Sequence, residues 1–227
     1  MNRAADRTYS GILFDLDGTL VDSLELILSS YRHTIKEHLG RTIPDEEWMR
    51  TMGMPLRIQL RSFTDSPQLL ESMFQTYIEH NQRNHDRLLR PFPGMQGVVA
   101  ALRNAGYRMG VVTSKIREHA WRELRAFGMD GYFDGMVSAD DVARPKPDPE
   151  PVLKALEALE LPAQEALFVG DSLFDLQAGR AAAVHTAAAL WGPFRRDRLE
   201  DGQPDYWLED VAALATLLGV VPEGHDG

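Results

Sequence analysis

The chain has 227 residues, of which 44% are hydrophobic, and it contains no cysteine. This composition indicates a globular protein with a sizeable core and excludes a disordered chain, disulfide bonds and thiolate metal sites. The formal net charge of -10 at pH 7 argues against binding to nucleic acid or to an anionic membrane surface. The amino-terminal segment MNRAADRTYS is polar and no apolar run is long enough to span a membrane, so we expect a cytoplasmic protein.

The first expected element is a short buried strand, Ile12 to Phe14, because this apolar run is followed by the turn sequence Asp-Leu-Asp-Gly. Apolar residues at helical spacing then predict an amphipathic helix over 24–39, which Gly40 ends. From Pro44 to Arg90 the pattern stays helical and indicates no strand. The segment RPFPGM at 90–95 is a stiff connector because it holds two prolines. An all-helical insert is therefore expected after the first strand.

After residue 95 the pattern alternates between helices and strands. The expected helices cover 95–104, 117–127, 149–159, 174–183 and 211–217, and the expected strands cover 108–113, 135–138, 166–169 and 185–190. Strands separated by helices of this length form a parallel sheet through right-handed crossovers, with both faces covered. The predicted fold is a doubly wound α/β core domain formed by 1–21 and 92–227, with a helical cap domain at 22–91.

Acidic residues follow two of the expected strands, at the sheet edge where such folds bind ligands. Asp15 and Asp17 follow the first strand, and both would point the same way if the strand alternation continued. Asp171 and Asp175 lie in the segment VGDSLFD. Four carboxylates at one edge repel one another unless a cation compensates for their charge. Carboxylate oxygens suit a hard divalent ion, so the sequence predicts a Mg²⁺ site and a substrate that carries phosphate oxygens.

Polar residues at two further strand ends fit the same chemistry. Thr113 and Ser114, in VVTSK, offer hydroxyl groups, and Lys146, in the proline-rich loop RPKPDP, offers a positive charge. Phosphoryl transfer depends on such positioning and charge stabilisation. Taken singly, these residues also fit simpler roles: the hydroxyls as a helix cap, the lysine as a surface charge, and Asp175 as a favourable charge in the first turn of a helix. Lys115 is a further candidate for contact with the substrate or with an acidic group.

The segments DLDGT, VVTS, the lysine of RPKPDP and GDSLFD, in this order, resemble the four motifs of the haloacid dehalogenase superfamily. The helical insert is similar to the type C1 cap of that superfamily. The resemblance implies that Asp15 is the nucleophile that forms an aspartyl phosphate and that Asp17 is the general acid and base. It also implies that Thr113 binds phosphate and that Lys146 stabilises charge. An acid two residues after the nucleophile favours a phosphatase over a dehalogenase.

The resemblance further implies phosphate or substrate contacts from Leu16, from Ser114 through its amide, and from Arg57 in the cap segment GMPLR. Arg57 also fits a solvated surface charge, and the segment has no lysine of the kind that forms a Schiff base in relatives that cleave phosphonoacetaldehyde. The expected Mg²⁺ ligands and their acidic neighbour are Asp15, Asp17 through its main-chain carbonyl, Asp171 and Asp175.

Within the superfamily, the segments HNQRNHDRLLRPFPG, TSK and KPDPEP most resemble the pyrophosphatases and the phosphoglycolate phosphatases. The stretches Asn84–Asp86 and Leu190–Gly192 favour the pyrophosphatases. The expected activity is Mg²⁺-dependent hydrolysis of a small phosphate ester or of pyrophosphate, by a monomer or weak homodimer. A phosphosugar mutase similar to β-phosphoglucomutase and a phosphoacceptor or binding protein without turnover remain the alternatives.

Overall fold

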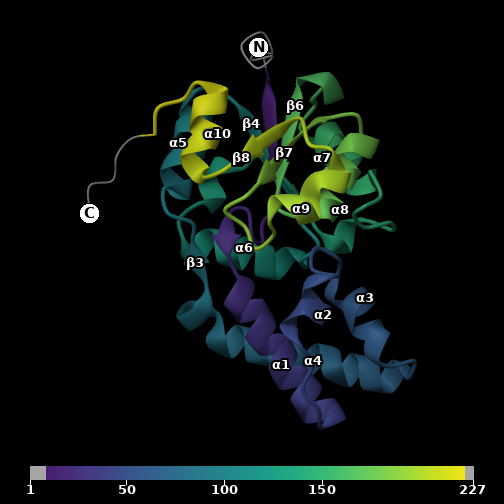
Figure 1. Ribbon diagram of the computed structural model, residues 1–227. Coiled ribbons are helices and arrows are strands. Elements are labelled where there is room, and N and C mark those ends of the chain that lie inside the picture. Colours follow the sequence, from purple (N-terminus) through teal and green to yellow (C-terminus); the bar gives the residue numbers. More distant parts are fainter. Residues whose placement is uncertain (1–8, 223–227) are drawn as a thin grey trace.

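The computed structural model describes residues 9–222, and their central feature is one parallel sheet of six strands (Figure 1). The strands are β1 (Gly11–Phe14), β4 (Arg108–Val112), β5 (Gly135–Val137), β6 (Ala166–Gly170), β7 (His185–Ala189) and β8 (Tyr206–Leu208). Their order in the sheet is β5-β4-β1-β6-β7-β8, so β1 lies between β4 and β6. The carboxyl ends of β1, β4 and β6 therefore lie side by side at one edge.

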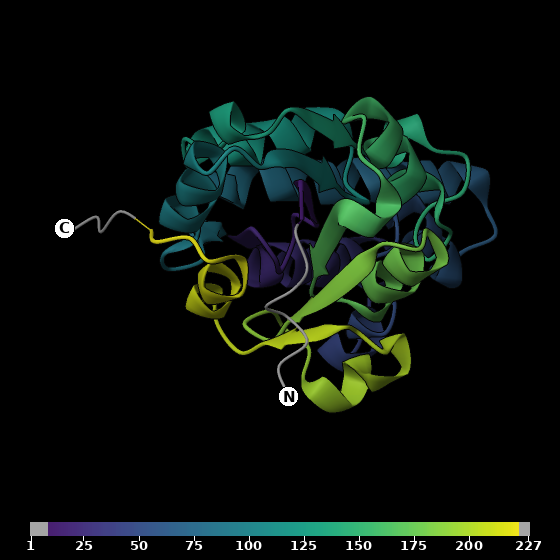
Figure 2. The ribbon, with the colours of Figure 1, turned by 90° about the horizontal axis from the view of Figure 1, so that it is seen from above.

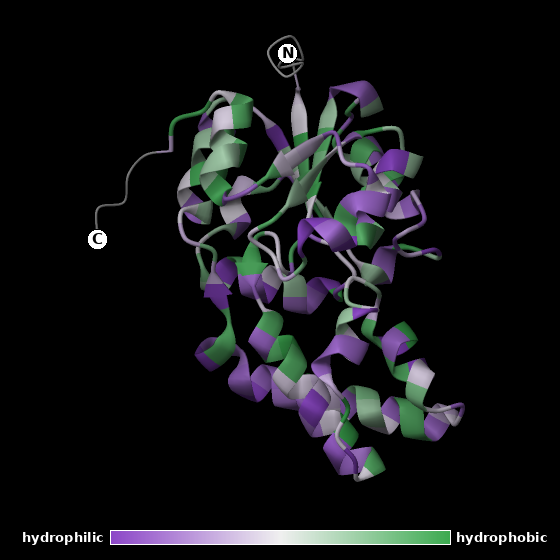
Figure 3. Cartoon of the chain, viewed as in Figure 1, coloured by the Kyte–Doolittle hydropathy of each residue, from purple (hydrophilic) through white to green (hydrophobic). Residues whose placement is uncertain are grey.

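Helices cover both faces of the sheet, as the view from above shows (Figure 2). Ile12 and Phe14 of β1 pack into one cluster with α5 (Met95–Asn104), α6 (Arg117–Ala126) and α10 (Val211–Leu218). Leu13 points to the opposite face, where α7 (Glu150–Ala158) and α8 (Leu173–Ala181) pack. Successive strand residues point to opposite faces, and both faces are buried, which explains why β1 is apolar throughout. In Figure 3 the central strands are largely hydrophobic, whereas the covering helices carry hydrophilic residues.

The helical insert lies at the carboxyl-end edge of the sheet (Figure 1). It contains α1 (Leu24–Leu39), α2 (Asp45–Met49), α3 (Leu56–Leu60), a 3-10 turn (Arg61–Phe63) and α4 (Pro67–Leu88). Helices α1 and α4 pack against each other around aromatic residues, with the rings of Tyr31 and Trp48 stacked at 3.9 Å between centroids. The two connections to the sheet domain pair as a short antiparallel ribbon of β2 (Val21–Asp22) and β3 (Arg90–Pro91).

The predicted doubly wound α/β fold is confirmed by this sheet and its flanking helices. The sequence pattern missed β2, β3, β8 and the short helix α9 (Arg196–Leu199), each of which has four residues or fewer. Elements this short carry too few residues to show a period of their own. Among the described helices, none is both long and apolar enough to cross a membrane.

Candidate active site

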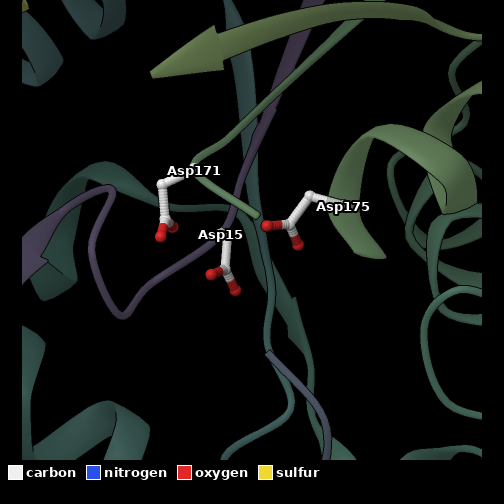
Figure 4. Close-up of side chains that lie close together, drawn as sticks. All are labelled: Asp15, Asp171 and Asp175. Atoms are coloured by element: carbon white, nitrogen blue, oxygen red, sulfur yellow. The ribbon is translucent and has the colours of Figure 1, made fainter. Parts of the chain in front are cut away.

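The carboxyl ends of β1 and β6 bring three acidic residues together (Figure 4). Asp15 follows β1 directly, Asp171 follows β6 directly, and Asp175 lies in the first turn of α8. Because Phe14 pairs with Val169 in the sheet register, the residues after both strands emerge at the same edge. The three side chains are buried and offer carboxylate oxygens that all lie within 4.8 Å of one another. We call these three residues the acidic cluster.

A buried lysine compensates for part of the negative charge of the cluster. Lys146 Nζ donates hydrogen bonds to Asp15 Oδ1 at 2.8 Å, to Asp175 Oδ1 at 2.6 Å and to the Val112 carbonyl at 3.2 Å. Lys146 is only 2% exposed, so the simpler expectation of a surface charge is wrong. Although burial opposes the charged form, the negative charges of Asp15 and Asp175 raise the pKa of Lys146 above its ordinary value.

The cluster carries more negative charge than one lysine offsets. Burial raises the pKa of Asp15 to about 7, and the charge of Asp175 adds to this rise, while Lys146 opposes it. Burial also raises the pKa of Asp171 well above its ordinary value, with repulsion from Asp15 as the second cause. Two carboxyl groups whose charged forms are disfavoured at one place need a further cation if both are to be ionised at neutral pH.

The hydrogen bonds of the cluster decide which oxygens remain for a metal ion. Asp15 Oδ1 accepts from the lysine, and Asp171 Oδ1 accepts from the Thr19 hydroxyl at 2.9 Å. Both oxygens of Asp175 are engaged, one by the lysine and the other by the amide and hydroxyl of Ser172 in a capping box. Within residues 9–222, Asp15 Oδ2 and Asp171 Oδ2 have no hydrogen-bond donor. These hard oxygens fit a divalent ion such as Mg²⁺, with Asp175 in an outer position.

Asp17 lines the same cavity but lies outside the acidic cluster. Strand β1 ends at Phe14, and the chain then turns back so that the following amides bond to the Leu16 carbonyl. The strand alternation therefore no longer sets the direction of Asp17. Asp17 Oδ1 accepts hydrogen bonds from Ser23 Oγ at 2.5 Å and from Lys115 Nζ at 2.7 Å. The expected convergence of four carboxylates is thus corrected to three, with the fourth directed at a lysine.

Thr113 and Ser114 follow β4 and line the cavity beside the cluster. Thr113 Oγ1 accepts a hydrogen bond from the Lys115 amide at 3.1 Å, and Ser114 Oγ donates to the Gly53 carbonyl of the helical insert at 2.6 Å. Neither residue caps α6, because that helix begins three residues after Ser114 and its N-cap makes no side-chain bond. Leu16, for which the resemblance implies a phosphate contact, is fully buried and is not among the residues that line the cavity.

Arg57 lines the cavity from α3 in the insert, but its charge is paired within the insert. Its guanidinium donates to Glu71 at 2.6 Å and lies 3.8 Å above the ring of Phe74. The Arg57 side chain is 49% exposed. This placement fits the surface-charge alternative, and a contact with substrate would require the guanidinium to leave Glu71.

The segment Leu190–Gly192 supports the cluster from the end of β7, a role that sequence reasoning missed. Trp191 Nε1 donates to the Thr19 carbonyl at 3.0 Å, and the Thr19 hydroxyl in turn holds Asp171. A Cβ at Gly192 would lie 2.5 Å from the Asp171 Cβ, so a side chain has no space there. The available signal was the position of this segment at the end of the strand predicted over 185–190. By contrast, Asn84–Asp86 at the end of α4 does not line the cavity.

Asp15 and Asp171 of the acidic cluster line the floor of a cavity of about 260 Å³ between the sheet edge and the insert, whereas Asp175 lies behind them and is not among the lining residues. Its insert wall is largely apolar or aromatic and is lined by Ile27, Tyr31, Met52, Met54, Leu56, Phe74, Tyr77 and Ile78. The lysine and arginine side chains that line it among the described residues are Arg57, Lys115 and Lys146, and each is paired with a carboxylate. A cavity of this kind can bind a small anion at its floor and exclude water when the insert covers it.

Comparisons with known proteins show the family of the chain. The family model described as haloacid dehalogenase-like hydrolase matches residues 12–189. A protein designated a candidate pyrophosphatase PpaX from Caldanaerobacter subterraneus subsp. tengcongensis is 41% identical, over 92% of this chain and 94% of its own length. The pyrophosphatase PpaX of Halalkalibacterium halodurans is 37% identical, over 92% of this chain and 96% of its own.

A solved structure of a candidate phosphoglycolate phosphatase from Lactobacillus plantarum superimposes with a TM-score of 0.82 at 26% identity. The superposition covers 92% of this chain and 99% of that one. The family match includes the strands that carry Asp15, Thr113 and Asp171 as well as the loop of Lys146. Because the family model matches most of the chain and relatives that are 41% and 37% identical cover nearly all of it, the chain belongs to the haloacid dehalogenase-like hydrolases.

Proposed function

We propose that this protein is a Mg²⁺-dependent phosphohydrolase that cleaves a small phosphate ester or pyrophosphate through an aspartyl phosphate on Asp15. The observation that carries the proposal is the buried acidic cluster. It holds three carboxylates, of which one lysine bonds to two, and two carboxylate oxygens have no donor within residues 9–222. Such an excess of buried negative charge does not stabilise a fold, so the cluster implies a bound cation. The names of the pyrophosphatase relatives support phosphate as the group transferred.

The metal ion would be held by Asp15, Asp171 and the main-chain carbonyl of Asp17. When bound, Mg²⁺ supplies positive charge that offsets the charge of the transferring phosphoryl group. Lys146 keeps one oxygen of Asp15 fixed, which orients the carboxylate toward a phosphate in the cavity. Thr113 and Ser114 offer hydrogen-bond donors near the place where that phosphate would lie.

In the proposed reaction an oxygen of Asp15 bonds to phosphorus while the bond from phosphorus to the leaving oxygen breaks. Asp17 donates a proton to the leaving oxygen and then removes a proton from water. That water attacks phosphorus, which releases inorganic phosphate and restores Asp15. Asp17 Oδ1 is held by Ser23 and Lys115, so Oδ2 is the oxygen left to exchange the proton.

We further propose that residues 22–91 act as a cap that moves relative to a core formed by 1–21 and 92–227. The two connections meet in the ribbon of β2 and β3, where bending in two short segments would move all the insert helices together. The hydrogen bond from Ser114 to Gly53 joins the cap to the cavity floor. Closure of the cap would exclude water from the phosphoenzyme until the leaving group departs.

The test is phosphate release from pyrophosphate, 2-phosphoglycolate and a panel of sugar phosphates, with Mg²⁺ and with a chelator. The pyrophosphatase relatives lead us to expect the highest kcat/KM with pyrophosphate. Asp15→Asn is expected to abolish turnover, and full activity of that variant would refute the mechanism. An isomerised sugar phosphate without free phosphate would indicate a mutase. A stable phosphoenzyme without continuous release would indicate a phosphoacceptor protein.

A further inference from the structure

Lys115 lies between two carboxylates at the rim of the acidic cluster. It directly follows Thr113 and Ser114 at the end of β4. Its ammonium donates to Asp17 Oδ1 at 2.7 Å and to Glu123 Oε1. The Lys115 side chain is 14% exposed, so both contacts are made largely out of water. Although burial opposes the charged form, Asp17 and Glu123 raise the pKa of Lys115 above its ordinary value. Lys115 is therefore a fixed cation whose two partners come from different parts of the chain.

Glu123 is an unusual residue for its position on α6. It is 1% exposed, and the hydrogen bond found for it goes to Lys115. Its second oxygen, Oε2, is buried and has no hydrogen-bond partner among the described residues. Burial raises the pKa of Glu123 to about 7. A buried acid with one unsatisfied oxygen costs stability, and a buried ion pair can often be replaced by apolar residues without loss. A contribution to the stability of the fold therefore does not explain why a glutamate is buried at residue 123.

The contacts of Asp17 show what the pair can do. Ser23 and Lys115 approach the same oxygen, Oδ1, and their two bonds fix the plane of the carboxylate. Oδ2 is then directed to one place in the cavity. Without Glu123, the flexible Lys115 side chain would be free to leave Asp17 for a phosphate oxygen of the substrate. Glu123 thus holds Lys115, and Lys115 holds Asp17.

We propose that Lys115 and Glu123 are positioning residues that hold the Asp17 carboxylate for proton transfer to the leaving oxygen and from the attacking water. This inference rests on the proposed phosphohydrolase mechanism, because it assigns no role outside that reaction. The pair makes no bond to phosphorus and delivers no proton itself. Its contribution is confined to the steps in which Asp17 gives or takes a proton.

The test compares phenyl phosphate with p-nitrophenyl phosphate in Glu123→Gln and Lys115→Met. The two esters have the same ring, but nitrophenolate leaves without help from an acid, whereas phenolate needs the proton. We expect kcat/KM for phenyl phosphate to fall at least about tenfold more than kcat/KM for p-nitrophenyl phosphate, because general acid catalysis contributes about 10²–10⁴ in rate. With p-nitrophenyl phosphate, slower attack by water should also produce a rapid burst of nitrophenolate before steady-state turnover.

A single substitution leaves one buried charge without its partner, which could prevent folding. The double variant Lys115→Met/Glu123→Leu removes both charges. We expect its loss of kcat/KM to depend on the leaving group as the loss in Lys115→Met does. Glu79→Gln is the matched control, because it removes a carboxylate from an exposed ion pair with Arg83. Equal losses of kcat/KM on both esters, with no burst, would overturn the positioning role. Absence of turnover in the unchanged enzyme, or full activity of Asp15→Asn, would instead overturn the proposed function and the inference with it.

Discussion

Lys146→Met tests the charge balance of the acidic cluster most sharply. The change removes an ammonium that is 2% exposed and lies within 2.8 Å of both Asp15 Oδ1 and Asp175 Oδ1, while the apolar stem is largely kept. Removing one partner of a buried ion pair costs about 3–5 kcal/mol, because the other charge stays buried without compensation. We expect a loss of this size in the free energy of unfolding, measured by urea denaturation at pH 7 with a chelator present.

Added Mg²⁺ should restore part of that stability in Lys146→Met, because a divalent ion at Asp15 and Asp171 offsets the same excess charge. Activity with Mg²⁺ should still fall by about 10²–10³, the usual cost of removing one group that stabilises transition-state charge. Lys154→Met is the matched control, since Lys154 is 44% exposed and pairs with Glu150 at the surface. A free energy of unfolding within about 0.5 kcal/mol of the unchanged protein, without metal, would refute this reasoning.

Three further predictions concern the metal, the support of Asp171 and the cap. The pKa of Asp15 is about 7 and that of Asp171 is also raised, so at lower pH protons must leave both carboxyl groups before a metal binds. Mg²⁺ affinity measured by calorimetry should therefore increase as pH rises from 5 to 8, and a constant affinity over this range would contradict the prediction. Gly192→Ala should lower the free energy of unfolding by about 1–3 kcal/mol and reduce activity. Gly131→Ala, where a Cβ meets nothing within 4 Å, should change neither. Equal melting temperatures of the two variants would show that a side chain at residue 192 is not crowded. Glu71→Gln should free Arg57 and lower KM for pyrophosphate, while Arg57→Ala should raise it; unchanged KM in both would exclude Arg57 from substrate binding.

The sequence predicted the sheet and the floor of the site because both depend on local patterns. The apolar strands β1, β4 and β6 can be recognised from their residues, and parallel strands place their carboxyl ends at one edge. The positions of Asp15 and Asp171 follow directly from that placement, whereas Lys146 reaches them from the loop before α7. The direction of Asp17 does not, because it depends on where β1 ends and on how tightly the chain turns after Phe14.

Contacts between distant segments account for what the sequence did not predict. Glu123 lies on a helix without a motif, and only the packed structure shows that it is buried against Lys115. The pairing of Arg57 with Glu71 likewise depends on how α3 and α4 pack within the insert. The bond from Ser114 to Gly53 requires the insert to lie over the sheet edge, and no pattern in either segment indicates this.

The central claim is that Asp15 bonds to phosphorus, and trapping the phosphoenzyme tests it most directly. The enzyme is mixed with substrate labelled in its phosphate and Mg²⁺ and is quenched in acid. One half of the protein is digested directly to find the labelled peptide. The other half is reduced with borohydride, which releases the phosphate and converts the phosphorylated carboxyl group to an alcohol that mass spectrometry locates. We expect the labelled peptide to contain Asp15 and the alcohol to lie at Asp15 alone. A label on another residue, or turnover without any labelled protein on the time scale of one catalytic cycle, would contradict the account.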